Sequence, residues 1–189
     1  MEIKPSIRHV KEMQEVLLSK DLNPEEELYY MFRGVGNKNK IRYDITEIPG
    51  KILGDEFVKT KGHYHDEFKE VYIVLEGEAI FLMQKGRDVI DDVYFVHASK
   101  DEVVVIPFGY GHITINPSEV TLKLGNFVSD ECGHDYESIG NKAGASYFYT
   151  TKGWLKNTNY KEVPEIREEK PLTKLPNNID ELCLKKAQN

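Results

Sequence analysis

The feature that most constrains this chain is a series of short β-strand segments between Ile52 and Val128. Turn residues separate these segments at intervals of about 8–12 residues. This spacing is typical of a β-sandwich or barrel, and it differs from the regular alternation of strands and helices in α/β proteins. We therefore predict an all-β core whose strands cover residues 56–59, 70–76, 78–84, 92–97, 102–107, 112–116 and 121–128.

The segment before this core predicts a helix and a hairpin. Apolar side chains recur at helical spacing between Ser6 and Leu18, which favours an N-terminal helix within residues 1–22. Two strand-like runs at 28–32 and 41–46 flank a glycine-containing stretch, which we interpret as a hairpin turn at 34–39.

The total of 189 residues fits one domain with short extensions. We expect the barrel to occupy residues 23–155, with one more strand at 146–150. Prolines and charged residues are frequent in 156–189, so this irregular C-terminal extension is expected to wrap over the surface or to be loosely ordered.

Charge and cysteine content narrow the class of protein. A net charge of −7 disfavours nucleic acid and anionic membranes as partners. The only cysteines, Cys132 and Cys183, lie too far apart in sequence for a disulfide framework or a cysteine-based zinc site. No stretch approaches the roughly 18 apolar residues of a membrane span. We therefore expect a soluble, cytoplasmic protein with reduced thiols.

Four side chains form a candidate metal site. Residues two apart on a strand point the same way, so His63 and His65 can direct both imidazoles into one cavity. Glu70 begins the next strand, and an antiparallel pairing would bring its carboxylate beside them. His112 follows the turn at 107–111 and supplies a third imidazole. Three histidines and one carboxylate suit a divalent first-row metal with open coordination positions.

The spacing of these residues resembles the two signature motifs of the cupin superfamily. The first reads His63-x-His65, four residues, Glu70, six residues, Gly77, and the second reads Pro107-x-Gly109-x-x-His112-x-x-x-Asn116. Phe57 and Asp101 stand where the family usually has glycine. The resemblance implies a jelly-roll barrel, or double-stranded β-helix, with the metal inside. Because cupins have many functions, the fold alone does not define an activity.

More specific segments are similar to the cupin-type glucose-6-phosphate isomerases. These are Pro49-Gly50-Lys51, Thr60-Lys61-Gly62-His63-Tyr64-His65, Glu70-Val71-Tyr72 and Gly133-His134-Asp135-Tyr136. The resemblance implies metal ligands at His63, His65, Glu70 and His112, catalytic positions at Glu70, Tyr72, His134 and Tyr136, and phosphate-binding positions at Thr46, Thr60 and Gly62. Lys61 is expected to face outward, and Tyr110 either lines the mouth of the site or has a structural role.

The function implied by this resemblance is interconversion of glucose 6-phosphate and fructose 6-phosphate by a homodimer with one divalent metal ion per subunit. Fe, Mn, Ni, Co and Zn all suit the ligands. Either a base, for which Glu70 is the first choice, moves a proton between C2 and C1, or a hydride shifts directly. A metal-dependent cupin dioxygenase and a non-enzymatic sugar-binding cupin are the alternative functions, and an isomerase acting on another sugar would differ only in preference.

Overall fold

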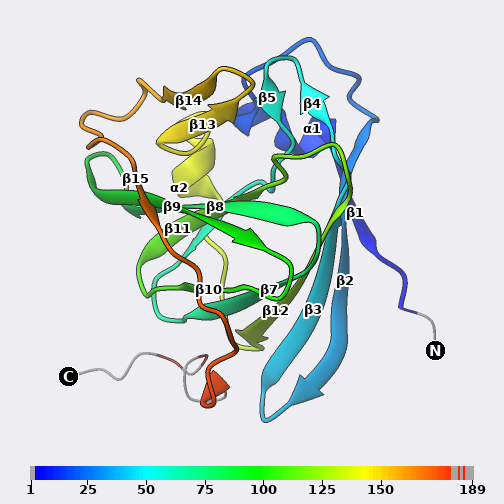
Figure 1. Cartoon of the computed structure of the whole chain (residues 1–189). Helices are drawn as coiled ribbons and strands as arrows, with labels where there is room; N and C mark the ends of the chain where they lie inside the picture. The colour runs from blue at the N-terminus through cyan, green and yellow to red at the C-terminus, as the bar shows by residue number, and fades with distance from the viewer. Residues whose placement is uncertain (1–2, 180–182, 184, 186–189) are drawn as a thin grey trace.

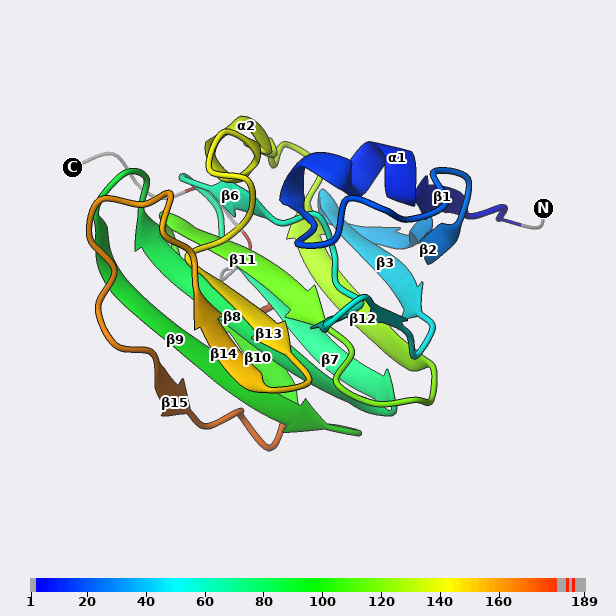
Figure 2. The same ribbon diagram turned by 90° about the horizontal axis from the view of Figure 1, so that it is seen from above.

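Two large β-sheets face each other, and a smaller third sheet packs on the outside of one of them (Figures 1 and 2). The computed structural model describes residues 3–179, 183 and 185. The first sheet has the order β1-β2-β3-β12-β7-β10, with β1 (Ser6–His9), β2 (Glu27–Lys38), β3 (Ile41–Ile48), β12 (Leu122–Ser129), β7 (Glu70–Glu76) and β10 (Val103–Ile106).

The second sheet has the order β15-β9-β8-β11-β6, with β15 (Arg167–Glu169), β9 (Ile90–Ser99), β8 (Glu78–Gly86), β11 (Tyr110–Ile115) and β6 (His63–His65). The third has the order β14-β13-β5-β4, with β14 (Gly153–Lys156), β13 (Tyr147–Thr150), β5 (Glu56–Phe57) and β4 (Ile52–Leu53). Each predicted strand segment overlaps an observed strand. In the segment at 56–59 only Glu56–Phe57, which form β5, are in a strand.

Eight strands form a jelly roll, with β3-β12-β7-β10 facing β6-β11-β8-β9. The predicted all-β cupin fold is therefore confirmed. The main core lies between the two sheets, and β8 is buried on both faces. Its Phe81 and Met83 point into this core, while Ile80 and Leu82 pack in a second cluster with residues of β13 and β14. Burial on both sides explains why this strand reads as a continuous apolar run.

The N-terminal segment differs from the predicted helix. Ser6–His9 forms β1 instead and pairs with the edge of β2, and the helix α1 (Val10–Met13) is followed by a 3-10 turn, η1 (Gln14–Val16). The apolar side chains of the helical part are buried as expected. The prediction of a single helix from Ser6 was wrong because hydrogen bonding to a sheet edge outweighed local helical spacing.

The predicted hairpin is present, but its turn lies further along the chain. The strand β2 continues through the glycines to Lys38, and the turn falls at Asn39 and Lys40, which both have positive φ (54° and 64°). Two such residues are characteristic of the tight turns that match strand twist. The glycines at 34 and 36 belong to an irregular register between β2 and β3.

The C-terminal extension wraps over the surface in its described part. The strand β15 pairs in parallel with β9, and Leu172 pairs with Val103 of β10, so the segment connects an edge of each large sheet (Figure 1). The helix α2 (Glu137–Gly140) lies beside β6 (Figure 2). None of the helices within the described ranges has the length and apolar character needed to cross a membrane.

Candidate metal centre and active site

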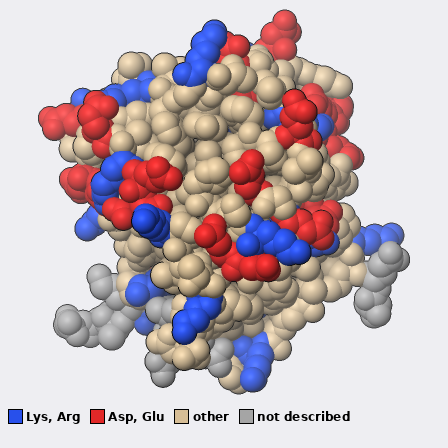
Figure 3. Space-filling view, viewed as in Figure 1, with Lys and Arg blue, Asp and Glu red and all other residues tan. Residues whose placement is uncertain are grey.

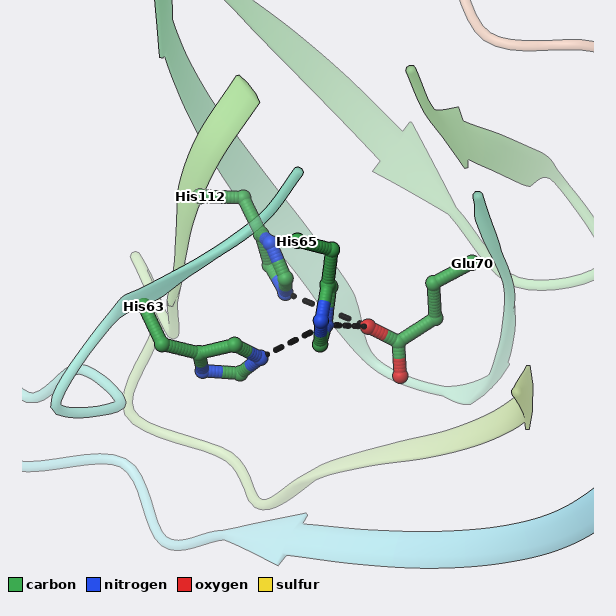
Figure 4. A group of neighbouring side chains, drawn as sticks. All are labelled: His63, His65, Glu70 and His112. Carbon is green, nitrogen blue, oxygen red and sulfur yellow. Dashed lines mark hydrogen bonds and ion pairs between the residues drawn. The ribbon is translucent and has the colours of Figure 1, made fainter. Parts of the chain in front are cut away.

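The three imidazoles converge because of the pairing of β6 with β11. His63 lies directly opposite His112 in this antiparallel ladder, and His65 lies on the same face of β6. Glu70 is the first residue of β7, which belongs to the facing sheet and does not pair with β6. The expectation that strand pairing would deliver the carboxylate was therefore wrong, because Glu70 reaches the imidazoles across the interior of the jelly roll (Figure 4).

The four ligand atoms have the spacing of a metal coordination sphere. They all lie within 4.8 Å of one another, so the four residues could hold a metal ion. His63 Nε2 lies 2.8 Å from His65 Nε2, and Glu70 Oε2 lies 3.1 Å from His65 Nε2 and 3.4 Å from His112 Nε2. Ligands about 2.1 Å from a metal and at right angles to each other are about 3 Å apart. The donor set and its geometry therefore fit a divalent metal.

The protonation states also fit a metal. Burial lowers the pKa of His63 well below its usual value and that of His112 to about 3, so both are neutral with free lone pairs at neutral pH. Burial lowers the pKa of His65 as well, but hydrogen bonds with Cys132 and Glu70 outweigh it and raise this pKa to about 10. Burial raises the pKa of Glu70, yet the hydrogen bond from His65 outweighs this effect and lowers it to about 2. An ionised carboxylate thus faces the imidazoles, and a cation can replace the proton of His65.

Neighbouring groups hold the ligands in place. His65 Nδ1 donates to the Gly133 carbonyl oxygen over 2.9 Å, which leaves Nε2 facing the other ligands. Cys132 Sγ lies 2.9 Å from the same Nδ1. Asn126 on β12 donates from Nδ2 to Glu70 Oε1, so only Oε2 of this carboxylate points at the histidines. Neither Cys132 nor Asn126 was identified from the sequence, because their role depends on which strands become neighbours.

The Gly133–Tyr136 segment lies beside the cluster, and its His134 and Tyr136 line the same pocket as His63. Its backbone pairs with β6, since Tyr64 N donates to Asp135 O and Asp135 N donates to Tyr64 O. This pairing directs His134 and Tyr136 toward His63, with ring centroids 4.7 Å and 5.1 Å from that imidazole. Burial chiefly, with help from nearby cations, lowers the pKa of His134 to about 4 and keeps it neutral.

One pocket brings the remaining predicted residues together with three of the ligands. It is lined by Thr46, Thr60, Gly62, His63, Glu70, Tyr72, His112, His134 and Tyr136, while the buried His65 does not line it. Thr60 Oγ1 accepts a hydrogen bond from Thr114 N over 3.0 Å, so the hydroxyl hydrogen is available to a ligand. Gly62 has φ +79°, and a Cβ there would lie 2.6 Å from Ile113 Cγ1. A side chain at this position would clash with Ile113, so this backbone conformation requires glycine.

Lys61 does not face outward as expected. Its side chain lines the pocket and pairs with Glu15 over 2.7 Å. The positive φ of Gly62 interrupts the strand alternation on which the expectation rested. Tyr110 lies away from this pocket and donates to Asp92, so its structural interpretation is the one supported.

Several pocket residues on β2 and β3 were not predicted from the sequence. Arg33 follows Tyr29 and Met31 at strand spacing, and Arg42 and Asp44 precede Thr46 in the same way. The period of two in these runs was the signal that could have placed them on one face. It was overlooked because residues 34–39 were interpreted as a turn.

A jelly roll that carries three histidines and one glutamate between its two sheets is a cupin-type protein. The profile of the glucose-6-phosphate isomerase (GPI) family matches residues 13–165, and the chain therefore belongs to this family.

Individual relatives agree with the family assignment. The chain is 33% identical over 96 residues to the glucose-6-phosphate isomerase of Thermococcus litoralis, covering 50% of this chain and 48% of that protein. It is 30% identical over 110 residues to the Pyrococcus furiosus enzyme of the same name, covering 57% and 56%. The chain thus spans about half the length of these relatives. Among solved structures, an oxalate oxidase gives a TM-score of 0.46 at 17% identity, covering 57% of this chain and 54% of that chain.

Proposed function

We propose that this protein is a metal-dependent aldose-ketose isomerase that interconverts glucose 6-phosphate and fructose 6-phosphate. The observation that carries the proposal is the joining, in one pocket, of the histidine and glutamate cluster with hydroxyl, glycine and aromatic groups. A cluster alone would suit many cupin reactions. The pocket adds donors that can bind a phosphorylated polyol, and the names of the relatives agree with this substrate.

In this proposal, Thr46, Thr60 and the backbone of Gly62 bind the phosphate group. A hydroxyl hydrogen and a glycine N–H that the chain can bring close are suitable donors to a phosphate dianion. Burial raises the pKa of Tyr72 well above its usual value, so its hydroxyl remains a donor at neutral pH. That hydroxyl lies 3.3 Å from His112 Nε2 and is placed to hold a sugar oxygen next to the cluster.

When bound by the four ligands, the metal would supply Lewis-acid polarisation of the sugar carbonyl. In the forward direction, the C2 hydrogen of the open-chain aldose moves to C1, and the hydroxyl proton of C2 moves to the oxygen of C1. In one mechanism a base carries the carbon-bound hydrogen from C2 to C1 as a proton, through an enediol. In the other, the same hydrogen shifts directly from C2 to C1 as a hydride. Neutral His134, with Tyr136 beside it, is placed to handle the oxygen-bound proton.

The resemblance predicts further properties that belong to the same proposal. One metal ion per subunit, with iron as one of the suitable metals, and a cytoplasmic homodimer are expected. The metal can be tested by elemental analysis after purification without added metal, and the subunit number by light scattering.

The function is tested by an assay on fructose 6-phosphate coupled to oxidation of glucose 6-phosphate. We expect turnover that a chelator abolishes and that a divalent first-row metal restores. The coupling enzyme must be unaffected by the chelator in a control that starts from glucose 6-phosphate. Oxygen consumption without isomerisation would favour a cupin dioxygenase. Sugar-phosphate binding without turnover in the metal-loaded protein would favour a sugar-binding cupin.

A further inference from the structure

Three cationic side chains line the candidate active-site pocket, and two of them are neutralised. Arg42 Nε donates to both carboxylate oxygens of Asp44, at 2.9 Å and 2.8 Å. Lys61 Nζ pairs with Glu15 over 2.7 Å. In the part of the chain that the structure describes, Arg33 has no carboxylate partner, and its Nη2 contacts only Met31 Sδ, at 3.5 Å. Arg33 is therefore the source of uncompensated positive charge in the pocket lining.

An irregularity of the sheet places Arg33 at the pocket. The register between β2 and β3 passes from Phe32↔Ile45 to Gly36↔Tyr43, so that residues 33–35 lie opposite the single residue Asp44. Such bulges bend a strand and redirect side chains, and they recur beside active sites. Two features fix this one. Gly34 has φ +67°, and its N–H donates to Asp44 Oδ1 over 2.7 Å.

Asp44 therefore affects two of the three cations, Arg42 by an ion pair and Arg33 through the position of the bulge. It is 5% exposed, and it neutralises Arg42 while it holds the bulge that carries Arg33. The arrangement leaves one arginine free to form two parallel hydrogen bonds with an oxyanion.

The negative net charge of the chain makes an unpaired cation in the pocket important for binding an anion. The chain carries a net charge of −7, and acidic and basic side chains are intermixed on the face seen in Figure 3. A dianion approaching a negatively charged protein is repelled unless the binding pocket supplies local positive charge.

We propose that Arg33 is the specificity-determining residue that captures the phosphate group of the substrate. The inference rests on the proposed function for the identity of that substrate. Arg33 adds charge-assisted recognition to the neutral donors of Thr46, Thr60 and Gly62, so phosphorylated sugars are selected over their unphosphorylated counterparts.

The test compares Arg33→Met with Arg33→Lys in the metal-loaded protein. Methionine keeps the unbranched stem of the side chain and removes the charged guanidinium group, whereas lysine keeps the charge and loses the planar fork. Lys38→Met removes one positive charge from the exposed end of the same strand, outside the pocket, and is the matched control. Binding of inorganic phosphate is measured by calorimetry at several salt concentrations, and KM and kcat are measured for fructose 6-phosphate.

We expect Arg33→Met to weaken inorganic phosphate binding and to raise KM by about tenfold, with kcat nearly unchanged. The salt dependence of phosphate binding should decrease in the same variant. Arg33→Lys should recover part of the affinity, and Lys38→Met should bind phosphate like the wild type. Unchanged phosphate affinity and KM in Arg33→Met, or an equal loss in Lys38→Met, would overturn the inference.

The two proposals fail in different ways. A wild-type protein that binds phosphate through Arg33 but does not isomerise fructose 6-phosphate would overturn the proposed function and support the role of Arg33. If the wild-type protein isomerises the sugar and Arg33→Met has the same KM as the wild type, the proposed function is supported and the role of Arg33 is overturned.

Discussion

Asn126 Nδ2 lies 2.5 Å from Glu70 Oε1 and fixes one oxygen of that carboxylate from the neighbouring strand. The strands β12 and β7 pair with Asn126 opposite Tyr72, so the amide reaches back to the carboxylate of Glu70, two residues earlier on β7. The other oxygen, Oε2, faces His65 and His112. Glu70 is thus held as an anion with a defined orientation, which is what a metal ligand requires.

Replacing the anchoring amide should weaken metal binding. Asn126→Leu has similar volume but removes the donor to Glu70, and loss of such a supporting hydrogen bond typically reduces metal affinity by about 10–100-fold. The measurement is competition for the metal with a chromophoric chelator. Asn37→Leu removes an exposed amide that bonds to Asp130, and neither residue belongs to the cluster or lines the pocket, so this variant should retain wild-type affinity. Equal affinities in the two variants would contradict a supporting role for Asn126.

Removal of any one imidazole should reduce both bound metal and activity. His63→Ala, His65→Ala and His112→Ala each delete a nitrogen from the cluster, and we expect metal content well below one ion per chain and loss of most isomerase activity. His97→Ala is the control, because His97 pairs with Glu78 on the surface. Circular dichroism should show that the fold persists. Full activity of a cluster variant in strictly metal-free buffer would contradict the proposal.

The histidines of the cluster could be predicted from the sequence because short-range patterns along the chain place them. His63 and His65 share a face by strand periodicity, and the turn before His112 marks where β11 begins. The route of Glu70 was not predictable in the same way. Whether the strand after a loop pairs with its predecessor or crosses to the facing sheet depends on the topology of the whole jelly roll.

Arg33 shows a second limit of sequence reasoning. Glycines at 34 and 36 are good turn residues, so local chemistry favoured a hairpin turn there. In the structure the strand continues through a bulge that Asp44 stabilises, and Asn39 with Lys40 makes the turn. The contact between Gly34 and Asp44 joins two strands, and a single-strand pattern carries no information about it.

Phosphate recognition can be tested at Thr60. Thr60→Val preserves the volume but deletes the hydroxyl, and a lost hydrogen bond to a charged group costs about 1.5–3 kcal/mol. We expect kcat/KM for fructose 6-phosphate to fall about 10- to 150-fold. Thr60→Ser keeps the hydroxyl and should recover most of the loss. Unphosphorylated fructose should be a very poor substrate for the wild type, and equal turnover of fructose and fructose 6-phosphate would remove phosphate from the proposal.

The backbone at Gly62 should not tolerate a side chain. Gly62→Ala places a Cβ 2.6 Å from Ile113 Cγ1 in a backbone conformation with φ +79°. Overpacking and left-handed strain together cost about 2–4 kcal/mol, so the melting temperature should fall by about 5–15 °C. Gly36→Ala is the control, since its Cβ would make an ordinary 3.6 Å contact with Tyr43. Differential scanning calorimetry of the metal-loaded variants measures both, and equal melting temperatures would contradict the close packing at Gly62.

A substitution of Glu70 can distinguish its role as a metal ligand from a role as the catalytic base. A pKa lowered to about 2, because the hydrogen bond from His65 outweighs burial, makes this carboxylate a weak base at neutral pH. Glu70→Gln keeps an oxygen for the metal, and the Asn126 side chain can rotate to accept from the new amide. We therefore expect the variant to bind metal more weakly and to recover much of its kcat in excess metal.

If Glu70 is instead the base, kcat should remain about 10²–10⁴-fold below wild type even with the metal site filled. Isomerisation in D₂O gives an independent measurement. Proton transfer through an enediol places solvent deuterium in the product, whereas a hydride shift carries the original hydrogen from C2 to C1. Recovery of kcat in metal-saturated Glu70→Gln without deuterium uptake would reject Glu70 as the base and favour hydride transfer. Deuterium uptake together with a persistent loss of kcat would restore Glu70 as the base.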